Sequence, residues 1–151
     1  MAPATAEETS ALGQLLELYS HDFSERTDAD VDADGRFGWR DLDAYWREPD
    51  RHPFLFRVDG KLAGFGLVRS GAPHDMAEFF VLRKYRRGGV GTDAARAVFA
   101  RFPGDWQTRQ QFANAAATVF WRRAIPVAFT ETPEGEGPIQ RFRIDGESPV
   151  P

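Results

Sequence analysis

The segment that most constrains the fold is the junction at residues 76–102, where RKYRRGGVG separates an apolar stretch from an alanine-rich one. MAEFFVL (76–82) has the composition of a strand. The apolar spacing from about Gly89 to Phe102 predicts a helix, and Pro103-Gly104 ends it. Glycines let backbone amides approach a ligand closely, and a helix N-terminus favours anions. This order of elements predicts a phosphate-binding turn.

Antiparallel hairpins and further helices surround this junction. FLFRV and KLAGFGLVRS flank an Asp-Gly turn and predict the clearest hairpin. The remaining expected elements are helices over 10–25, near 40–47 and over 111–124, and strands over 105–109, 127–131 and 138–144, the last two joined by the TPEGEG turn. This order predicts an α/β (α+β) fold with a mixed, mostly antiparallel central sheet and helices on both faces. Residues 1–151 contain no long linker, so we expect one domain.

Composition narrows the function classes. The chain has no cysteine, which excludes disulfides, thiolate metal sites and a cysteine nucleophile. Its net charge of −4 argues against a general nucleic-acid binder. No apolar run reaches the roughly 18 residues of a membrane span, and MAPATAEETS lacks the pattern of a signal peptide. We therefore expect a cytoplasmic protein that binds neither nucleic acid nor membrane. The local basic cluster RKYRR indicates a small anion instead.

Two common phosphate-binding loops fit the junction poorly. A mononucleotide P-loop needs a lysine after its last glycine, whereas Thr92 and Asp93 follow Gly91 here. The string from Gly89 to Ala94 does satisfy the dinucleotide pattern G-x-G-x-x-A. However, six residues separate this string from the strand, and antiparallel hairpins flank the only such unit. The dinucleotide interpretation is therefore weak.

A third pattern covers more of the chain. The run from Val81 to Gly91, with the spacing Arg86-x-x-Gly89-x-Gly91, resembles the acetyl-CoA motif of the GNAT N-acetyltransferase superfamily. That motif is commonly Val-x-Pro-x-x-Arg-Gly-x-Gly-x-Gly, so Arg83 stands for its proline and Arg87 for its first glycine. A second family motif has its counterpart in Asn114, Ala117, Phe120 and Trp121. The order of elements also agrees, except that no convincing first strand precedes Leu12.

The resemblance implies acetyl-CoA as cosubstrate and direct transfer of its acetyl group to a primary amine of a small molecule or peptide. It implies that an amide near Val81 polarises the thioester carbonyl. Glu78, on the same strand beside the expected reacting centre, is the first candidate for the base, directly or through water, and an exposed or salt-bridged carboxylate is the alternative. The implied cofactor-binding residues are those of the strand, the loop and the following helix: Phe79, Phe80, Val81, Arg86, Arg87, Gly88, Gly89, Val90, Gly91, Thr92, Asn114 and Trp121. The loop amides and arginines would hold the pyrophosphate.

Several alternatives remain open at this level. Glu131 and His74 are weaker candidates for the base. The tyrosine that often protonates the thiolate in the family falls at Trp121, whose indole has no accessible acid chemistry. The proton donor is therefore unassigned, and a non-catalytic acyl-CoA-binding or sensor domain is the alternative function. The edge of the C-terminal hairpin could also pair two copies into a homodimer.

The acidic segment DADVDADGRFGWRD has its own pattern. Asp30, Asp32, Asp34 and Asp41 follow the calcium spacing of an EF-hand, with Gly35 at the turn. The final ligand is aspartate instead of the longer glutamate, and no second hand exists. The alternatives are an acidic loop that attracts a cationic amine and a plain solvated loop. The main interpretation therefore includes no metal.

Overall fold

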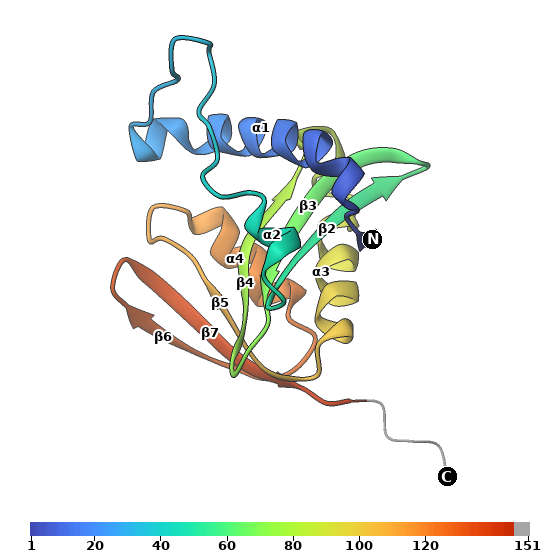
Figure 1. Cartoon of the computed structure of the whole chain (residues 1–151). Helices are drawn as coiled ribbons and strands as arrows, with labels where there is room; N and C mark the ends of the chain where they lie inside the picture. Colours follow the sequence, from blue (N-terminus) through green and yellow to red (C-terminus); the bar gives the residue numbers. More distant parts are fainter. Residues whose placement is uncertain (147–151) are drawn as a thin grey trace.

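A computed structural model of the chain describes residues 1–146 (Figure 1). Seven strands form one sheet in the order β1-β2-β3-β4-β5-β7-β6. They are β1 (Ala2–Pro3), β2 (Arg51–Val58), β3 (Lys61–Arg69), β4 (His74–Val81), β5 (Gly104–Arg109), β6 (Phe129–Glu134) and β7 (Gly137–Ile144). Neighbours are antiparallel except β4 and β5, which run parallel. The predicted mixed, mostly antiparallel sheet is confirmed.

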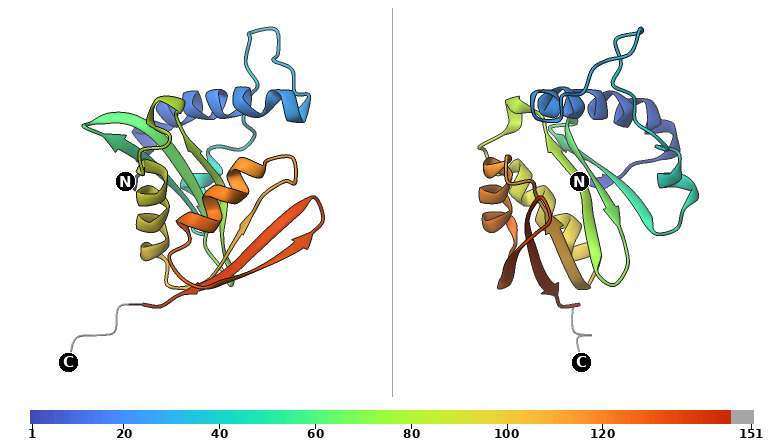
Figure 2. Two further views of the ribbon diagram at one scale, coloured as in Figure 1. Left: turned by 180° about the vertical axis from the view of Figure 1, so that it is seen from behind. Right: turned by 90° about the vertical axis from the view of Figure 1, so that its left-hand side faces the viewer.

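Helices cover both faces of this sheet (Figure 2). α1 and α2 lie on one face, and α3 and α4 lie on the other. Their bounds are α1 (Thr9–Thr27), α2 (Ala44–Arg47), α3 (Val90–Arg101) and α4 (Ala115–Ala124), with short 3-10 helices at η1 (Ala6–Glu8) and η2 (Arg83–Tyr85). Within residues 1–146, no helix combines the length and apolar character needed to cross a bilayer.

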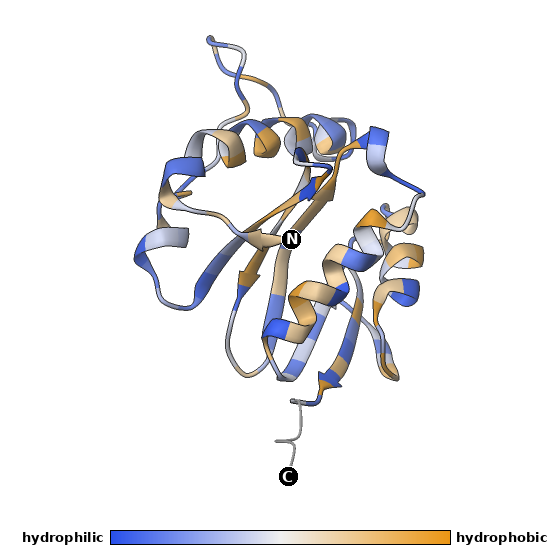
Figure 3. Ribbon diagram, turned by 90° about the vertical axis from the view of Figure 1, so that its right-hand side faces the viewer, coloured by the Kyte–Doolittle hydropathy of each residue, from blue (hydrophilic) through white to orange (hydrophobic). Residues whose placement is uncertain are grey.

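The sheet separates two apolar cores. The α3/α4 side buries Val98 and Phe99 of α3 with Trp106 of β5. The α1/α2 side buries Leu12 and Leu16 of α1 against the middle strands. β2 and β3 are apolar along their middles and carry charged residues at their ends, as the hydropathy colouring shows (Figure 3). Because both faces of these strands are covered, they lack the alternating pattern of a half-exposed strand.

The parallel strands β4 and β5 stay paired for only two residues. His74 pairs with Trp106 and Asp75 with Gln107, and beyond this point the two strands diverge (Figure 1). On its other side β4 contains a bulge, because Glu78 and Met76 lie opposite consecutive residues of β3. The extra residue bends the strand locally. The pairing between β4 and β5 therefore ends in the middle of the sheet. Beyond Asp75, the edge of β4 that faces β5 borders a gap.

The chain before Leu12 does contribute a strand, which corrects the sequence expectation. Ala2 pairs with Leu55 and Pro3 with Phe54. The amide of buried Ala4 extends this contact by donating to the Pro53 carbonyl at 2.9 Å. A two-residue strand has no periodicity to detect, so only its tertiary partner reveals it.

Three other boundaries differ from expectation. The helix expected over 111–124 begins at Ala115, because the Asn114 side chain caps it by accepting from the Ala117 amide at 3.3 Å. The helix near 40–47 covers only Ala44–Arg47. The strand expected over 127–131 lies at Phe129–Glu134, so the hairpin turn is shorter than the TPEGEG segment suggested. Local composition marks such turns, whereas cross-strand pairing sets where they end.

Candidate active site

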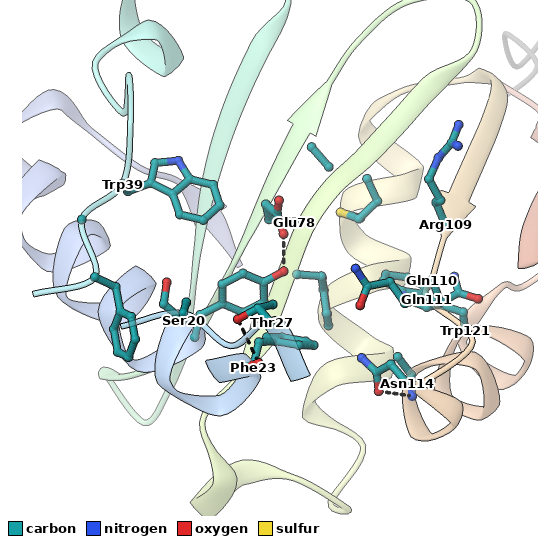
Figure 4. A pocket seen from close by; sticks show the side chains of 18 of the residues that line it. Ser20, Phe23, Thr27, Trp39, Glu78, Arg109, Gln110, Gln111, Asn114 and Trp121 are labelled. Atoms are coloured by element: carbon teal, nitrogen blue, oxygen red, sulfur yellow. Dashed lines mark hydrogen bonds between the residues drawn. The ribbon is translucent and has the colours of Figure 1, made fainter. Parts of the chain in front are cut away.

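The gap between β4 and β5 contains a cavity of about 510 Å³ (Figure 4). α1 and the segment after it form one wall, β4 crosses the middle, and the end of β5 with α4 forms the other wall. The lining residues are Tyr19, Ser20, Phe23, Thr27, Ala29, Asp30, Phe37, Gly38, Trp39, Met76, Ala77, Glu78, Phe79, Arg109, Gln110, Gln111, Asn114, Ala117 and Trp121. Its volume lies in the usual range for small-molecule sites, roughly 300–1,000 Å³.

The arginine–glycine loop leads into the N-terminus of α3 near one end of this gap. Arg87 and Gly89 both adopt left-handed backbone conformations, with φ of 68° and 85°. Within residues 1–146, the amides of residues 87–92 donate to no other group of the chain. Successive free amides at a helix N-terminus form a concave anion site. The loop therefore fits a pyrophosphate without rearrangement of its own hydrogen bonds.

Two glycines in the loop have different physical roles. Gly89 has the positive φ that glycine adopts without strain. Gly91 instead allows close packing, because a Cβ there would lie 3.1 Å from the Phe120 ring and 3.3 Å from Val81 Cγ2. At Gly88 a Cβ would meet nothing within 4 Å. Gly89 thus allows the turn of the loop, and Gly91 allows α3 to pack closely against β4 and α4.

The two loop arginines also differ. Arg86 donates from Nε to the Val81 carbonyl at 2.8 Å and pairs with Asp22 of α1. Its guanidinium also lies 5.6 Å from the centre of the Phe80 ring. Arg87 is exposed and forms no hydrogen bond or ion pair within the described chain. Arg86 therefore braces the loop against β4 and α1, which leaves Arg87 as the arginine open to an anion.

Backbone alternation decides which groups of β4 face the gap. The Leu82 amide donates to the Ala63 carbonyl of β3 at 2.8 Å. In an antiparallel ladder, every second residue turns its backbone groups to the same neighbour. Phe80 therefore also points its backbone toward β3, and its side chain is buried in the α1-side core. Phe79 and Val81 point their amides toward the gap, where β5 has already diverged.

Glu78 lies at the middle of the cavity and accepts a hydrogen bond from the Tyr19 hydroxyl of α1 (Figure 4). Burial raises the pKa of Glu78, the Tyr19 hydrogen bond opposes this rise, and the charge of Asp75 adds to it. Burial and the Glu78 charge raise the pKa of Tyr19, so it remains a neutral phenol. A half-buried carboxylate with a raised pKa is suited to accept a proton near neutral pH.

Asn114 and Trp121 both contact the cavity from α4. Asn114 uses its side-chain oxygen as the helix cap, which leaves its amide NH₂ available. Trp121 is only 6% exposed and packs edge-on against Phe79, with ring centres 5.0 Å apart. It therefore supplies an apolar wall between the core and the cavity.

The two weaker base candidates lie outside this cavity. Glu131 of β6 pairs with Arg122, and hydrogen bonds from Arg122 and Gln140 lower the pKa of Glu131 to about 2. His74 accepts from the Gly71 amide at 3.0 Å and lies 3.0 Å from the Pro103 carbonyl. Both of its ring nitrogens are therefore engaged. Neither side chain is placed to deprotonate a molecule beside Glu78.

The acidic segment after α1 forms a loop with internal contacts. The Asp32 carboxylate accepts from the amides of Asp34 and Arg36, and Asp41 pairs with Arg47. Asp30 lines the cavity. In the described part of the chain, no group of three or more acidic, histidine or cysteine side chains is arranged to hold a metal ion. The calcium spacing therefore does not correspond to a gathered ligand set.

From the sequence, Tyr19 was a possible pocket-lining aromatic with no chemical role assigned, and Arg109 had no site role at all. Tyr19 was one of several aromatics that fit a helical core pattern, and its hydroxyl was the only signal of a polar partner. Arg109 ends a short strand whose composition gives no warning of a ligand site. Both residues reach the cavity only because β4 and β5 diverge.

Comparisons with known proteins agree with this arrangement. The acetyltransferase (GNAT) family matches residues 12–124, so the chain belongs to this family. An acetyltransferase from Thermus thermophilus has 16% identity and a TM-score of 0.71, with 93% of this chain and 92% of that chain covered. No curated protein has a significantly similar sequence.

Two further solved structures share the fold. PaiA N-acetyltransferase from Thermoplasma acidophilum, solved in complex with coenzyme A, has 10% identity and a TM-score of 0.66, covering 93% of this chain and 96% of that one. A ribosomal-protein-alanine N-acetyltransferase from Brucella melitensis has 16% identity and a TM-score of 0.60, covering 94% and 98%. At these identities the likeness concerns the fold.

Proposed function

We propose that this protein is an N-acetyltransferase that moves the acetyl group of acetyl-CoA to a primary amine by direct attack. The observation that carries the proposal is the row of unpartnered amides at residues 87–92, which leads to a cavity with the Glu78 carboxylate at its centre. Membership of the acetyltransferase (GNAT) family supports it. The coenzyme A bound to the Thermoplasma protein, which has the same fold, is a further support.

The residues of this chain divide into those that hold the cosubstrate and those that act on it. The amides of residues 87–92 and the Arg87 side chain hold the pyrophosphate. Phe79 and Val81 offer backbone groups to the pantetheine arm along the open edge of β4, and Asn114 offers its NH₂. Bound in this way, the cosubstrate supplies an activated acetyl thioester. We assign the Val81 amide, which faces the gap, as the donor to its carbonyl oxygen.

Glu78 prepares the acceptor. A primary amine arrives mainly as an ammonium ion, and the Glu78 carboxylate takes one of its protons. The nitrogen lone pair then forms a bond to the acetyl carbon, and the carbon–sulfur bond breaks with its electron pair on sulfur. The nitrogen releases a second proton and the thiolate takes up one from water. One ammonium ion and one thioester thus yield one amide, one thiol and one free proton.

This chain differs from the common family pattern in the group that could protonate the leaving thiolate. Trp121 occupies the position at which tyrosine often serves as acid, and the indole cannot release its proton at neutral pH. We therefore assign the proton to water and assign Trp121 to the apolar wall of the cavity. The alternative of a non-catalytic acyl-CoA sensor rests on this same substitution.

Thermal unfolding with acetyl-CoA tests the cosubstrate. At 100 times the dissociation constant, a ligand stabilises the folded state by about 2.7 kcal/mol, which corresponds to roughly 5–10 °C in Tm for a chain of this length. Thiol release across a panel of amines then tests turnover. Glu78→Gln should keep the thermal shift and lose turnover. No shift at millimolar acetyl-CoA would contradict the proposal, and a shift without turnover on any amine would favour the sensor.

A further inference from the structure

An arginine without a partner lies across the cavity from Glu78. Arg109 is the last residue of β5 and lines the cavity (Figure 4). Within residues 1–146 its guanidinium forms no ion pair and no hydrogen bond. Arg141 and Arg143 on the adjacent strand β7 pair with Glu134 and Asp105. Arg109 is thus a cation without an ion-pair partner in the part of the chain that the structure describes.

Arg109 and Glu78 lie on the same side of the sheet. Trp106 of β5 is buried in the core on the α3/α4 side. Because side chains alternate along a strand, Arg109 points to the opposite side, the one covered by α1 and α2. Glu78 faces this side too, since it contacts Tyr19 of α1. A small molecule that enters from the α1/α2 side therefore meets a carboxylate on one strand and a guanidinium on the other.

Asp75 is the acidic residue of β4 within the stretch paired to β5, where it lies opposite Gln107, two residues before Arg109. It lies on the same side, where burial raises its pKa and the charge of Arg109 opposes the rise. It makes no ion pair with Arg109 in the described chain. The donors of Arg109 therefore remain available to a ligand.

Aromatic side chains form the third part of the site. Phe23, Phe37 and Trp39 line the wall beside Tyr19, and each is partly exposed. Tyr19 itself is held by edge-on contacts to Phe23 and Trp39, with ring centres 4.8 and 6.3 Å apart. These rings offer apolar surface, and the charged residue that lines the cavity from the same wall is Asp30. The rings therefore fit an apolar substituent of the acceptor.

We propose that the amine acceptor is a free amino acid with an apolar side chain. Its carboxylate pairs with Arg109, its amine faces Glu78, and its side chain lies against the aromatic wall. This inference rests on the proposed function, because it assigns the acceptor of the same site. A guanidinium and a carboxylate form parallel charge-assisted hydrogen bonds, which give both affinity and orientation.

The same charges disfavour other amines. A polyamine would place a second ammonium beside the Arg109 guanidinium, and like charges at close range repel. An amine without a carboxylate leaves the arginine without a partner. The site therefore selects for an anionic group on the acceptor as well as for the amine.

Matched pairs of amines test this selection. We would measure kcat/KM with L-phenylalanine and L-leucine and with the amide of each, in the wild type and in Arg109→Gln. The amide keeps the side chain and the amine and lacks only the carboxylate charge. Its amine is also the less basic one, so a larger fraction of it is unprotonated near neutral pH, which favours the amide. Calorimetry of L-phenylalanine binding to the protein with bound CoA gives a readout that does not depend on turnover.

We expect the wild type to prefer the acids by at least about tenfold. Arg109→Gln should lower kcat/KM for the acids by about 10- to 100-fold, the loss expected for a hydrogen bond between charged groups, and leave the amides unchanged. Arg109→Lys should recover part of the preference. Arg143→Gln is the control, because that exposed arginine does not line the cavity.

The outcomes separate this inference from the proposed function. Turnover of amides at or above the rate of acids, or an equal loss on both in Arg109→Gln, overturns the amino-acid assignment and leaves the acetyltransferase proposal intact. Acetyl-CoA binding without any binding of L-phenylalanine or L-leucine also overturns the assignment. Absence of both acetyl-CoA binding and turnover contradicts the proposed function itself.

Discussion

Replacement of Tyr19 by phenylalanine removes one hydroxyl and with it the hydrogen bond to Glu78. The ring packs edge-on against Phe65 and Phe80, with centres 5.6 and 5.8 Å apart, and phenylalanine keeps these contacts. The change therefore acts on the charge state of Glu78 more than on packing. Since the hydroxyl donates to the carboxylate, it stabilises the charged form, and its loss raises the pKa of Glu78 further.

The expected effect is confined to the acidic side of the pH profile. Glu78 must be unprotonated to act as base, so activity is lost as pH falls through its pKa. A higher pKa moves this loss to higher pH. A hydrogen bond to a charged group contributes about 1.5–3 kcal/mol, so on the acidic limb kcat/KM should fall by about 10-fold or more. At high pH, where Glu78 is charged in both proteins, the rates should converge.

The assay is thiol release from acetyl-CoA, followed as kcat/KM between about pH 5 and 10 in the wild type, Tyr19→Phe and Tyr85→Phe. Tyr85 is the matched control, because it lies in η2 outside the cavity. The substrate amine titrates equally in all three, so only differences between the proteins are informative. Profiles that superpose, or a Tyr19→Phe loss that is the same at every pH, would refute the role of this hydrogen bond.

Two further pairs of substitutions test the loop. Gly91→Ala should reduce the free energy of unfolding by about 1–3 kcal/mol in urea titrations, because the new methyl group meets the Phe120 ring at 3.1 Å. Gly88→Ala is the control and should change this free energy little, because the space around its Cβ is open. Equal losses in the two variants would argue against the packing role of Gly91. Arg87→Gln should weaken acetyl-CoA binding by about tenfold or more in calorimetry without loss of Tm, as expected for one charge-assisted hydrogen bond. Arg86→Gln should lower Tm, because it removes the contact with Asp22. If Arg87→Gln lowered Tm and Arg86→Gln weakened only acetyl-CoA binding, the roles assigned to the two arginines would be wrong.

Local sequence patterns were sufficient for most of the fold. The hairpin around Asp59-Gly60 and the strand–loop–helix unit at residues 76–102 form as expected, because turn glycines and apolar periodicity act over short distances. The site loop could be recognised for the same reason, since its glycines and arginines are contiguous. The loop's free amides follow from its place at the start of α3.

Pairing between distant segments was beyond such patterns. β1 is a strand only because Leu55 and Phe54 lie beside it, and the early end of the β4–β5 pairing is visible only in the folded sheet. This divergence opens the cavity. The fold also changed the role expected of Arg86. Its guanidinium pairs with Asp22, which lies 64 residues away in the chain.

The sequence alone determined the family and the loop that we propose binds the cosubstrate, because the motif residues lie close together along the chain. The tertiary structure decided which residues form the side of the cavity that we propose for the acceptor. Tyr19 from α1, Glu78 from β4 and Arg109 from β5 meet only across the gap in the sheet. The roles that we propose for them depend on this shared cavity, which no local pattern encodes.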